Sequence, residues 1–276
     1  MKRFFLKSRK ALFAGVFIGL TALAVPASAS LSITPTIVVI EGRERFAEVH
    51  LVNPTNVVNS YEINWRFMRM EEGTGIYVNQ DKSVTDWDLT KHIVYTPRRI
   101  TIDPNTAQKV RLALRLGGEP PAPGDYRAHM EFMKSADKPA PIDETAPKKP
   151  TAKANVGVKV NVGFSIPVIY RVGESDATAK IGNVTTTLKG GKIYAIVPIA
   201  KSKSNYGIEG NIAVSYQDKV VGQVKNANIF SEIQGRTFEI PLSVEKLAGG
   251  NLQIVYKDFD TKKNKVYDQI SVPISK

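Results

Sequence analysis

Side chains that could carry out catalytic chemistry are few in this chain of 276 residues and poorly spaced. There is no cysteine, and none of the three histidines stands at metal-ligand spacing from another ligand. Asp86 and Asp88 offer two carboxylates, but they flank Trp87 in an evident loop, where a solvated surface is the better interpretation. The histidines are His50, His92 and His129.

Motifs that bind phosphate or activate a serine are also absent. The sequence contains no Gly-Lys-Ser/Thr loop, no Gly-x-Ser-x-Gly elbow and no Gly-x-Gly-x-x-Gly turn. No set of residues could act together as acid, base and nucleophile. We therefore expect a protein that is not an enzyme and that uses no metal and no cofactor.

The most regular pattern is a long apolar alternation over residues 156–168. Small or polar residues separate its apolar members, and period two is typical of a strand. At about 3.3 Å per residue the segment spans on the order of 40 Å, which exceeds an ordinary strand. Its large apolar residues are Val156, Val158, Val160, Val162, Phe164, Ile166 and Val168.

Two interpretations of this segment stay open. It could be a core strand of a β-sandwich with one wet face. It could also serve a partner, because Pro167 cannot donate to a ladder and so places at least that end on a sheet edge. An apolar edge strand is normally an aggregation hazard, and a protein that keeps one has a use for it.

The N-terminus has the form of an export signal over residues 1–29. A basic stretch precedes the apolar run 11–25, and Ala27-Ser28-Ala29 matches a cleavage site. A transmembrane anchor is the alternative, but about 15 apolar residues fall short of the roughly 20 that a span needs. We expect cleavage after Ala29 and export.

Charge and composition exclude nucleic acid as a partner. Removing the five basic residues of the signal lowers the formal charge from +12 to +7, and no basic helix or aromatic–basic signature follows. An exported chain without cysteine must rely on burial alone, without disulfides.

From residue 31 onward the chain alternates between short strands and turns, without a convincing 3.6-residue period. This predicts an all-β fold made of two immunoglobulin-like sandwiches, one over residues 30–170 and one over 171–276. Residues 135–154 are rich in Ala, Pro, Lys and Asp and lack large apolar residues, so they predict a long, mobile loop directly before the alternating segment. The strands predicted in the first sandwich are 36–40, 45–52, 61–67, 95–102, 109–116, 125–134 and 156–168.

Several short motifs, in order, resemble the PapD-like periplasmic chaperones of chaperone–usher pili, and in part the archaic Csu-type branch. No single motif is highly specific, but their order and spacing together are, and they span nearly the whole mature chain. The matching residues are Ser32–Thr36 with Glu41-Gly42, Asn53-Pro54, Thr96-Pro97, Ile102–Pro104, Gln108–Arg111, Tyr126–His129, Ile166–Arg171, Ser204–Gly207 and Asn228–Phe230.

This resemblance implies donor-strand complementation, in which the chaperone lends a strand to an incomplete pilus subunit. The resemblance implies a periplasmic location, and as partners pilus or fimbrial subunits and an outer-membrane usher. The sequence does not say whether the free protein caps this strand by forming a homodimer. By the resemblance, the donor row is Val156, Val158, Val160 and Val162, with Phe164.

One departure concerns the anchor for the subunit's terminal carboxylate. The family's usual arginine and lysine fall near Ile37 and Pro167 here, so the usual pair is missing. Arg127 begins a strand expected to run antiparallel to the donor strand, and Arg171 lies at the domain boundary. An arginine fork suits a carboxylate, so both are candidate anchors, with a surface arginine or a domain–domain contact as the alternative for each.

A second class of function fits the same features. An exported structural or adhesive β-sandwich of a surface fibre could use its long strand to complete a neighbouring copy. A binding module or inhibitor of a surface enzyme is a more distant third. Co-expression separates the first two, since a chaperone gives soluble one-to-one complexes and a fibre protein assembles with itself.

Overall fold

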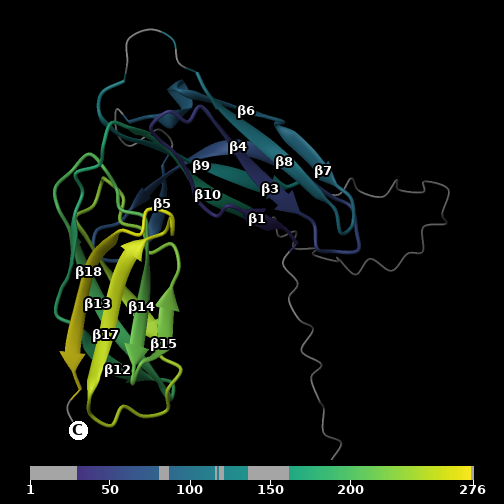
Figure 1. Ribbon diagram of the computed structural model, residues 1–276. Coiled ribbons are helices and arrows are strands. Elements are labelled where there is room, and N and C mark those ends of the chain that lie inside the picture. The colour runs from purple at the N-terminus through teal and green to yellow at the C-terminus, as the bar shows by residue number, and fades with distance from the viewer. Residues whose placement is uncertain (1–29, 81–86, 116, 118–120, 136–161, 275–276) are drawn as a thin grey trace, which may run out of the picture.

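The computed structural model describes residues 30–80, 87–115, 117, 121–135 and 162–274 (Figure 1). In these residues the fold is all-β, with one short 3₁₀ turn at Leu89–Lys91. None of the described helices is long and apolar enough to cross a bilayer. The predicted signal peptide, residues 1–29, and the predicted loop lie wholly or mostly outside the described residues.

The first sandwich consists of two sheets built from the strands before residue 173. One sheet has the order β1-β3-β8-β6 and the other β2-β10-β9-β4-β5, with β7 paired to β4. The strands of the first sheet are β1 (Ser32–Thr34), β3 (Phe46–Val52), β8 (Ala107–Leu114) and β6 (Ile93–Thr96). Those of the second are β2 (Val38–Ile40), β10 (Gly163–Val172), β9 (Gly124–Lys134), β4 (Asn59–Met70), β5 (Tyr77–Gln80) and β7 (Arg99–Ile102).

The core of this sandwich follows from period-two alternation on the facing strands. In β4, Tyr61 and Ile63 are fully buried, whereas the residue after Ile63, Asn64, is exposed. Met130 and Phe132 of β9 are buried on the same side of that sheet, and all four belong to one apolar cluster. Burial of such large side chains supplies the main driving force for folding in a chain without disulfides.

The second sandwich repeats the architecture with eight strands. Its sheets have the orders β11-β13-β12, with β16 paired to β13, and β15-β14-β17-β18. A second apolar cluster fills the space between them. The strands are β11 (Ala179–Ile181), β12 (Thr185–Lys189), β13 (Lys192–Lys201), β14 (Gly210–Tyr216), β15 (Lys219–Val224), β16 (Gly235–Pro241), β17 (Asn251–Asp258) and β18 (Val266–Pro273).

One strand predicted from the sequence is wrong. Residues 95–102 do not form a single strand, because Pro97 has no N–H to donate to a ladder and no strand continues through it. The segment divides into the end of β6 and the whole of β7, which belong to different sheets. Each piece keeps period two, but the buried positions change from odd numbers in β6 to even numbers in β7.

The two sandwiches meet at an angle, with β5 and one end of β10 at the junction (Figure 1). Ile169 in β10 packs into the cluster of the second sandwich, whereas its neighbours Val168 and Tyr170 pack into that of the first. The strand thus serves both cores. β10 continues to Val172 and so runs across the predicted domain boundary between residues 170 and 171. That boundary stays a prediction.

Candidate binding site

β10 is unevenly paired along its length. On one side it pairs antiparallel with β9 from Gly163, opposite Met133, to Val172, opposite Gly124. On the other side it pairs with β2 only from Val168 to Tyr170. Among the described residues, the half of β10 before Val168 therefore has no partner strand on that edge. Pro167, which has no N–H to donate, lies in this half of the strand.

The even-numbered side chains of β10 run from a buried to an exposed environment. Val168 and Ile166 are 0% and 4% exposed, and Phe164 is half-buried against the first core. Val162, just before the strand, is 49% exposed. The apolar row thus leaves its own core where the edge is open. The other predicted donor residues, Val156, Val158 and Val160, lie outside the described residues.

Arg127 projects from β9 at the junction, in register with Ile169 of β10. Its Nη2 donates a 3.1 Å hydrogen bond to the Met68 carbonyl and also contacts the Glu232 carboxylate. The guanidinium carbon lies 3.9 Å from the centroid of the Phe230 ring, a cation–π geometry. Nη1 is buried and has no hydrogen-bond partner among the described residues. The N–H groups of Nη1 are therefore available to an additional acceptor.

His129 lies two residues further along β9 and is 2% exposed. Its ring is 5.0 Å from that of Tyr77, edge to face, and neither ring nitrogen has a hydrogen-bond partner in the described part of the chain. Burial, reinforced by the positive charge of Arg127, lowers the pKa of His129 to about 3. The ring is accordingly neutral near pH 7, and it adds unpaired polar atoms beside Arg127.

Arg171 is 8% exposed and is committed to carboxylates inside the chain. Its Nε and Nη2 donate to the two oxygens of Asp125 at 2.8 and 2.7 Å, and Nη2 also donates to Glu209 at 2.9 Å. Burial alone would lower the pKa of Arg171, but Asp125 and Glu209 more than compensate and raise it. Since Glu209 belongs to the segment just before β14, this network joins the two sandwiches.

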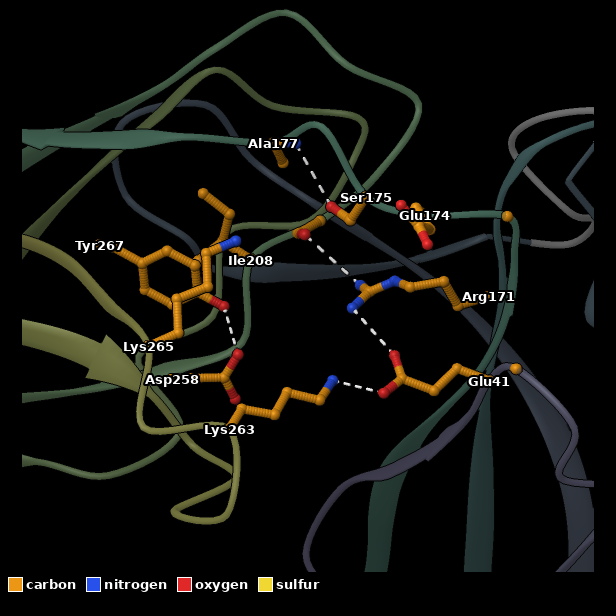
Figure 2. Close-up of a pocket in the computed structure, with 13 residues that line it drawn as sticks. Glu41, Arg171, Glu174, Ser175, Ala177, Ile208, Asp258, Lys263, Lys265 and Tyr267 are labelled. Carbon is orange, nitrogen blue, oxygen red and sulfur yellow. Dashed lines mark hydrogen bonds and ion pairs between the residues drawn. The ribbon is translucent and has the colours of Figure 1, made fainter.

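A pocket of about 320 Å³ opens beside Arg171 (Figure 2). On its walls, the Glu41 carboxylate contacts Lys263 and lies 3.8 Å from Nη1 of Arg171. Tyr267 donates to Asp258 at 2.9 Å. These side chains point toward one another in Figure 2, so each of them forms its ion pair or hydrogen bond with another residue of the pocket wall.

The structure thus brings the two predicted arginines to one face of the β9–β10 pair. Asp125, the residue opposite Arg171, lies two positions before Arg127, and both guanidinium groups contact the second sandwich. No local sequence pattern indicates the contact of Glu232 with Arg127 or that of Tyr77 with His129. Phe230 does belong to a motif of the resemblance, but the motif gives no sign that its ring stacks on Arg127.

In the described residues, no group of three or more histidine and acidic side chains is placed to hold a metal ion. Within the part of the chain that the structure describes, the β9–β10 pair instead offers a strand edge without a partner before Val168 and, nearer the junction, a buried guanidinium whose Nη1 has no hydrogen-bond partner. An unpaired strand edge is where an extended polypeptide can add a strand.

Comparison with known proteins gives matches in solved structures only. Neither a protein-family model nor a curated protein matches the sequence. The E. coli chaperone DraB is 15% identical, covering 88% of this chain and 98% of its own at a TM-score of 0.40. The CupB2 chaperone of Pseudomonas aeruginosa is 12% identical, covering 88% and 99%, with a TM-score of 0.42.

A third similar structure is a complex of CsuC and CsuE, a chaperone and a tip adhesion subunit of archaic Csu pili from Acinetobacter baumannii. It is 13% identical and covers 89% of this chain and 98% of its own at a TM-score of 0.41. Each of these three alignments extends over most of the chain.

Proposed function

We propose that this chain is a periplasmic chaperone that binds pilus or fimbrial subunits by donor-strand complementation and delivers them to an outer-membrane usher. The observation that carries the proposal is the course of β10: its apolar row begins inside a core and leaves it along an edge that has no partner strand among the described residues. An incomplete sandwich could add its own strand there and take up the apolar side chains. The role requires binding only, without catalysis.

The energetics of the predicted row are sufficient for such binding. Four valines, each stabilising by roughly 1.5–3 kcal/mol when fully buried, give about 6–12 kcal/mol before the costs of association. Docking and ordering remove much of this. The main-chain ladder adds affinity independent of the subunit's side chains, so one chaperone can serve several subunits.

Arg127 is the better candidate for the carboxylate anchor. Its Nη1 is buried and unpartnered among the described residues, and such a donor gains most from a charged acceptor. Arg171 stays a candidate, but in the free chain its N–H groups are directed at Asp125 and Glu209. A subunit carboxylate there would have to replace an existing buried partner.

The donor row is tested by Val158→Glu with Val160→Glu in the full chain, co-expressed with candidate subunits encoded beside it. We expect the soluble one-to-one complex to disappear, because two charges would have to enter an apolar groove. Val220→Glu is the matched control, since Val220 is 61% exposed on β15 of the second sandwich. Unchanged complex yield in the double variant, with normal folding by circular dichroism, would contradict the proposal.

The same open edge of β10 also accommodates a second copy of this chain, which is what a fibre-forming protein would need. Sizing of the purified chain without subunits separates the two functions. A chaperone gives monomers, or dimers that dissociate when a subunit is added. Growing polymers would favour the structural or adhesive function instead.

A further inference from the structure

The hairpin of β4 and β5 crosses from the first sandwich to the second (Figure 1). At its tip, the Gly73 N–H donates to the Gly235 carbonyl at 3.0 Å, and Thr237 N–H donates to the Gly73 carbonyl at 2.8 Å. Glu72 accepts a 2.9 Å hydrogen bond from the backbone N–H of Gln234. The tip is thus attached to β16 of the second sandwich and to the residue before it.

Glu232 lies in the same turn, before β16, and reaches back into the first sandwich. Its Oε1 accepts the Met70 N–H at 2.9 Å and also contacts Nη2 of Arg127. The side chains of Arg127 and Glu232 are 13% and 9% exposed. A carboxylate of the second sandwich therefore holds the guanidinium proposed as the anchor for a client.

This contact is weaker than an arginine–carboxylate pair can be. A bidentate pair uses two parallel N–H···O bonds, but the hydrogen bonds between these two side chains involve only Nη2 and Oε1. Nη1 of Arg127 is buried without a partner among the described residues, as is Nε of the nearby Arg236. A carboxylate free to rotate could satisfy more of these donors than Glu232 does.

We propose that Glu232 is an internal competitor for the client's terminal carboxylate. It occupies Arg127 in the free chain, neutralises the buried charge and braces the β4–β5 hairpin, and it yields when a client binds. This inference rests on the proposed function, because it assumes that Arg127 anchors a client.

The competition would make the chaperone selective. Glu232 is tethered, so a free carboxylate must overcome a high effective local concentration to displace it. A client that also pairs with β10 gains additional binding energy from the strand, and so can displace Glu232 where an isolated chain terminus cannot. Glu232 thus prevents Arg127 from binding the terminus of a chain that does not also pair with β10.

The test uses Glu232→Gln in the full chain and a synthetic strand peptide of 15 alternating apolar and polar residues. The peptide is made with a free C-terminal carboxylate and as the C-terminal amide. Glutamine keeps the size of Glu232 and still accepts the Met70 N–H, but it carries no charge. Calorimetry should show the variant binding the carboxylate peptide about tenfold more tightly than the wild type, within the usual range of coupling between sites.

The two peptides separate this inference from the proposed function. The amide should bind wild type and variant alike, and Glu239→Gln, at an exposed residue of the second sandwich, should behave as the wild type. If both peptides bind but Glu232→Gln gains nothing for the carboxylate form, the competitor role is wrong and the proposed function survives. If neither peptide binds any of the proteins, both proposals fail.

Arg127→Gln provides a second measurement, should the glutamine at position 232 lower the folded fraction. It removes the guanidinium, so the variant should bind the carboxylate and amide peptides equally. A retained preference for the carboxylate would place the anchor elsewhere and overturn the competitor role of Glu232.

Discussion

At the scale of single residues, the buried ring of His129 makes stability depend on pH. In the folded chain burial and then Arg127 lower its pKa to about 3, whereas the unfolded chain protonates near the ordinary value of about 6.5. The unfolded state therefore binds more protons below pH 6.5, and stability falls as the pH drops from there toward 3. Above pH 6.5 the ring is neutral in both states, so His129 causes no loss of stability there.

We expect this histidine to cost up to about 1.4 kcal/mol of unfolding free energy per pH unit across that window. Urea unfolding at pH 7, 5.5 and 4.5 measures the slope. His129→Phe, which keeps an aromatic ring beside Tyr77 and Phe230, should lose less stability on acidification than the wild type. His50→Gln, at an exposed position, is the control, and an unchanged slope in His129→Phe would contradict the pKa shift.

At the scale of elements, Asn53 joins two turns of the first sandwich. It is fully buried, and its Nδ2 donates to the carbonyls of Val57 at 2.7 Å and Ile102 at 3.0 Å. Its Oδ1 accepts from the Thr55 N–H at 3.1 Å and from Nδ2 of Asn59 at 2.9 Å. The turn after β3 is thereby attached to the end of β7, about 50 residues away in sequence.

Asn53→Ala should lower the free energy of unfolding by about 1–3 kcal/mol for each buried group that it leaves unsatisfied. Chemical denaturation measures the change directly. Asn56→Ala, an exposed change in the same turn, should have almost no effect. Equal losses in the two variants would show that the buried amide network contributes nothing.

The sequence predicts most strands because their alternation is a local property. Alternation identifies the apolar core positions Ile63 of β4 and Met130 of β9, but it does not predict that Asp125 and His129 of β9 are also buried, where they contact the second sandwich. It does not predict that residues 95–102 form two strands in different sheets, because the change of phase at Pro97 does not say which strand each piece pairs with. The polar stretch around β5 also shows no sign that it crosses to another domain.

At the scale of the whole molecule, the Arg171 network fixes the two sandwiches to each other. Asp125 is 4% exposed, accepts two hydrogen bonds from Arg171 and one of 2.8 Å from the Gly207 N–H. Removing one partner of a buried ion pair leaves an uncompensated charge, which is strongly unfavourable.

Asp125→Asn should therefore destabilise the folded chain by about 3–5 kcal/mol in urea unfolding at pH 7. The control is Glu239→Gln, which breaks the exposed pair with Lys189 and should cost less than about 1 kcal/mol. If the two variants lose the same stability, the buried network is not what holds the sandwiches together.

At this scale the sequence predicts the candidate site only in part. Arg127 and Arg171 can be selected because strand order places them near the predicted donor strand. Their partners cannot, because Glu232 lies 105 residues after Arg127 and contacts it only once both sandwiches have formed. Contacts between domains depend on the angle between them, which leaves no periodic trace in the sequence.

The antiparallel register of β10 with β9 also has a mechanical consequence. The two strands remain paired without a break from Gly163 to Val172, and the far end of β10 is embedded in both cores. Tension applied along β10 from its open end would load these cross-strand bonds in shear, so that many must rupture together instead of unzipping one after another. A polypeptide held on that end could be pulled hard without stretching the strand that carries it.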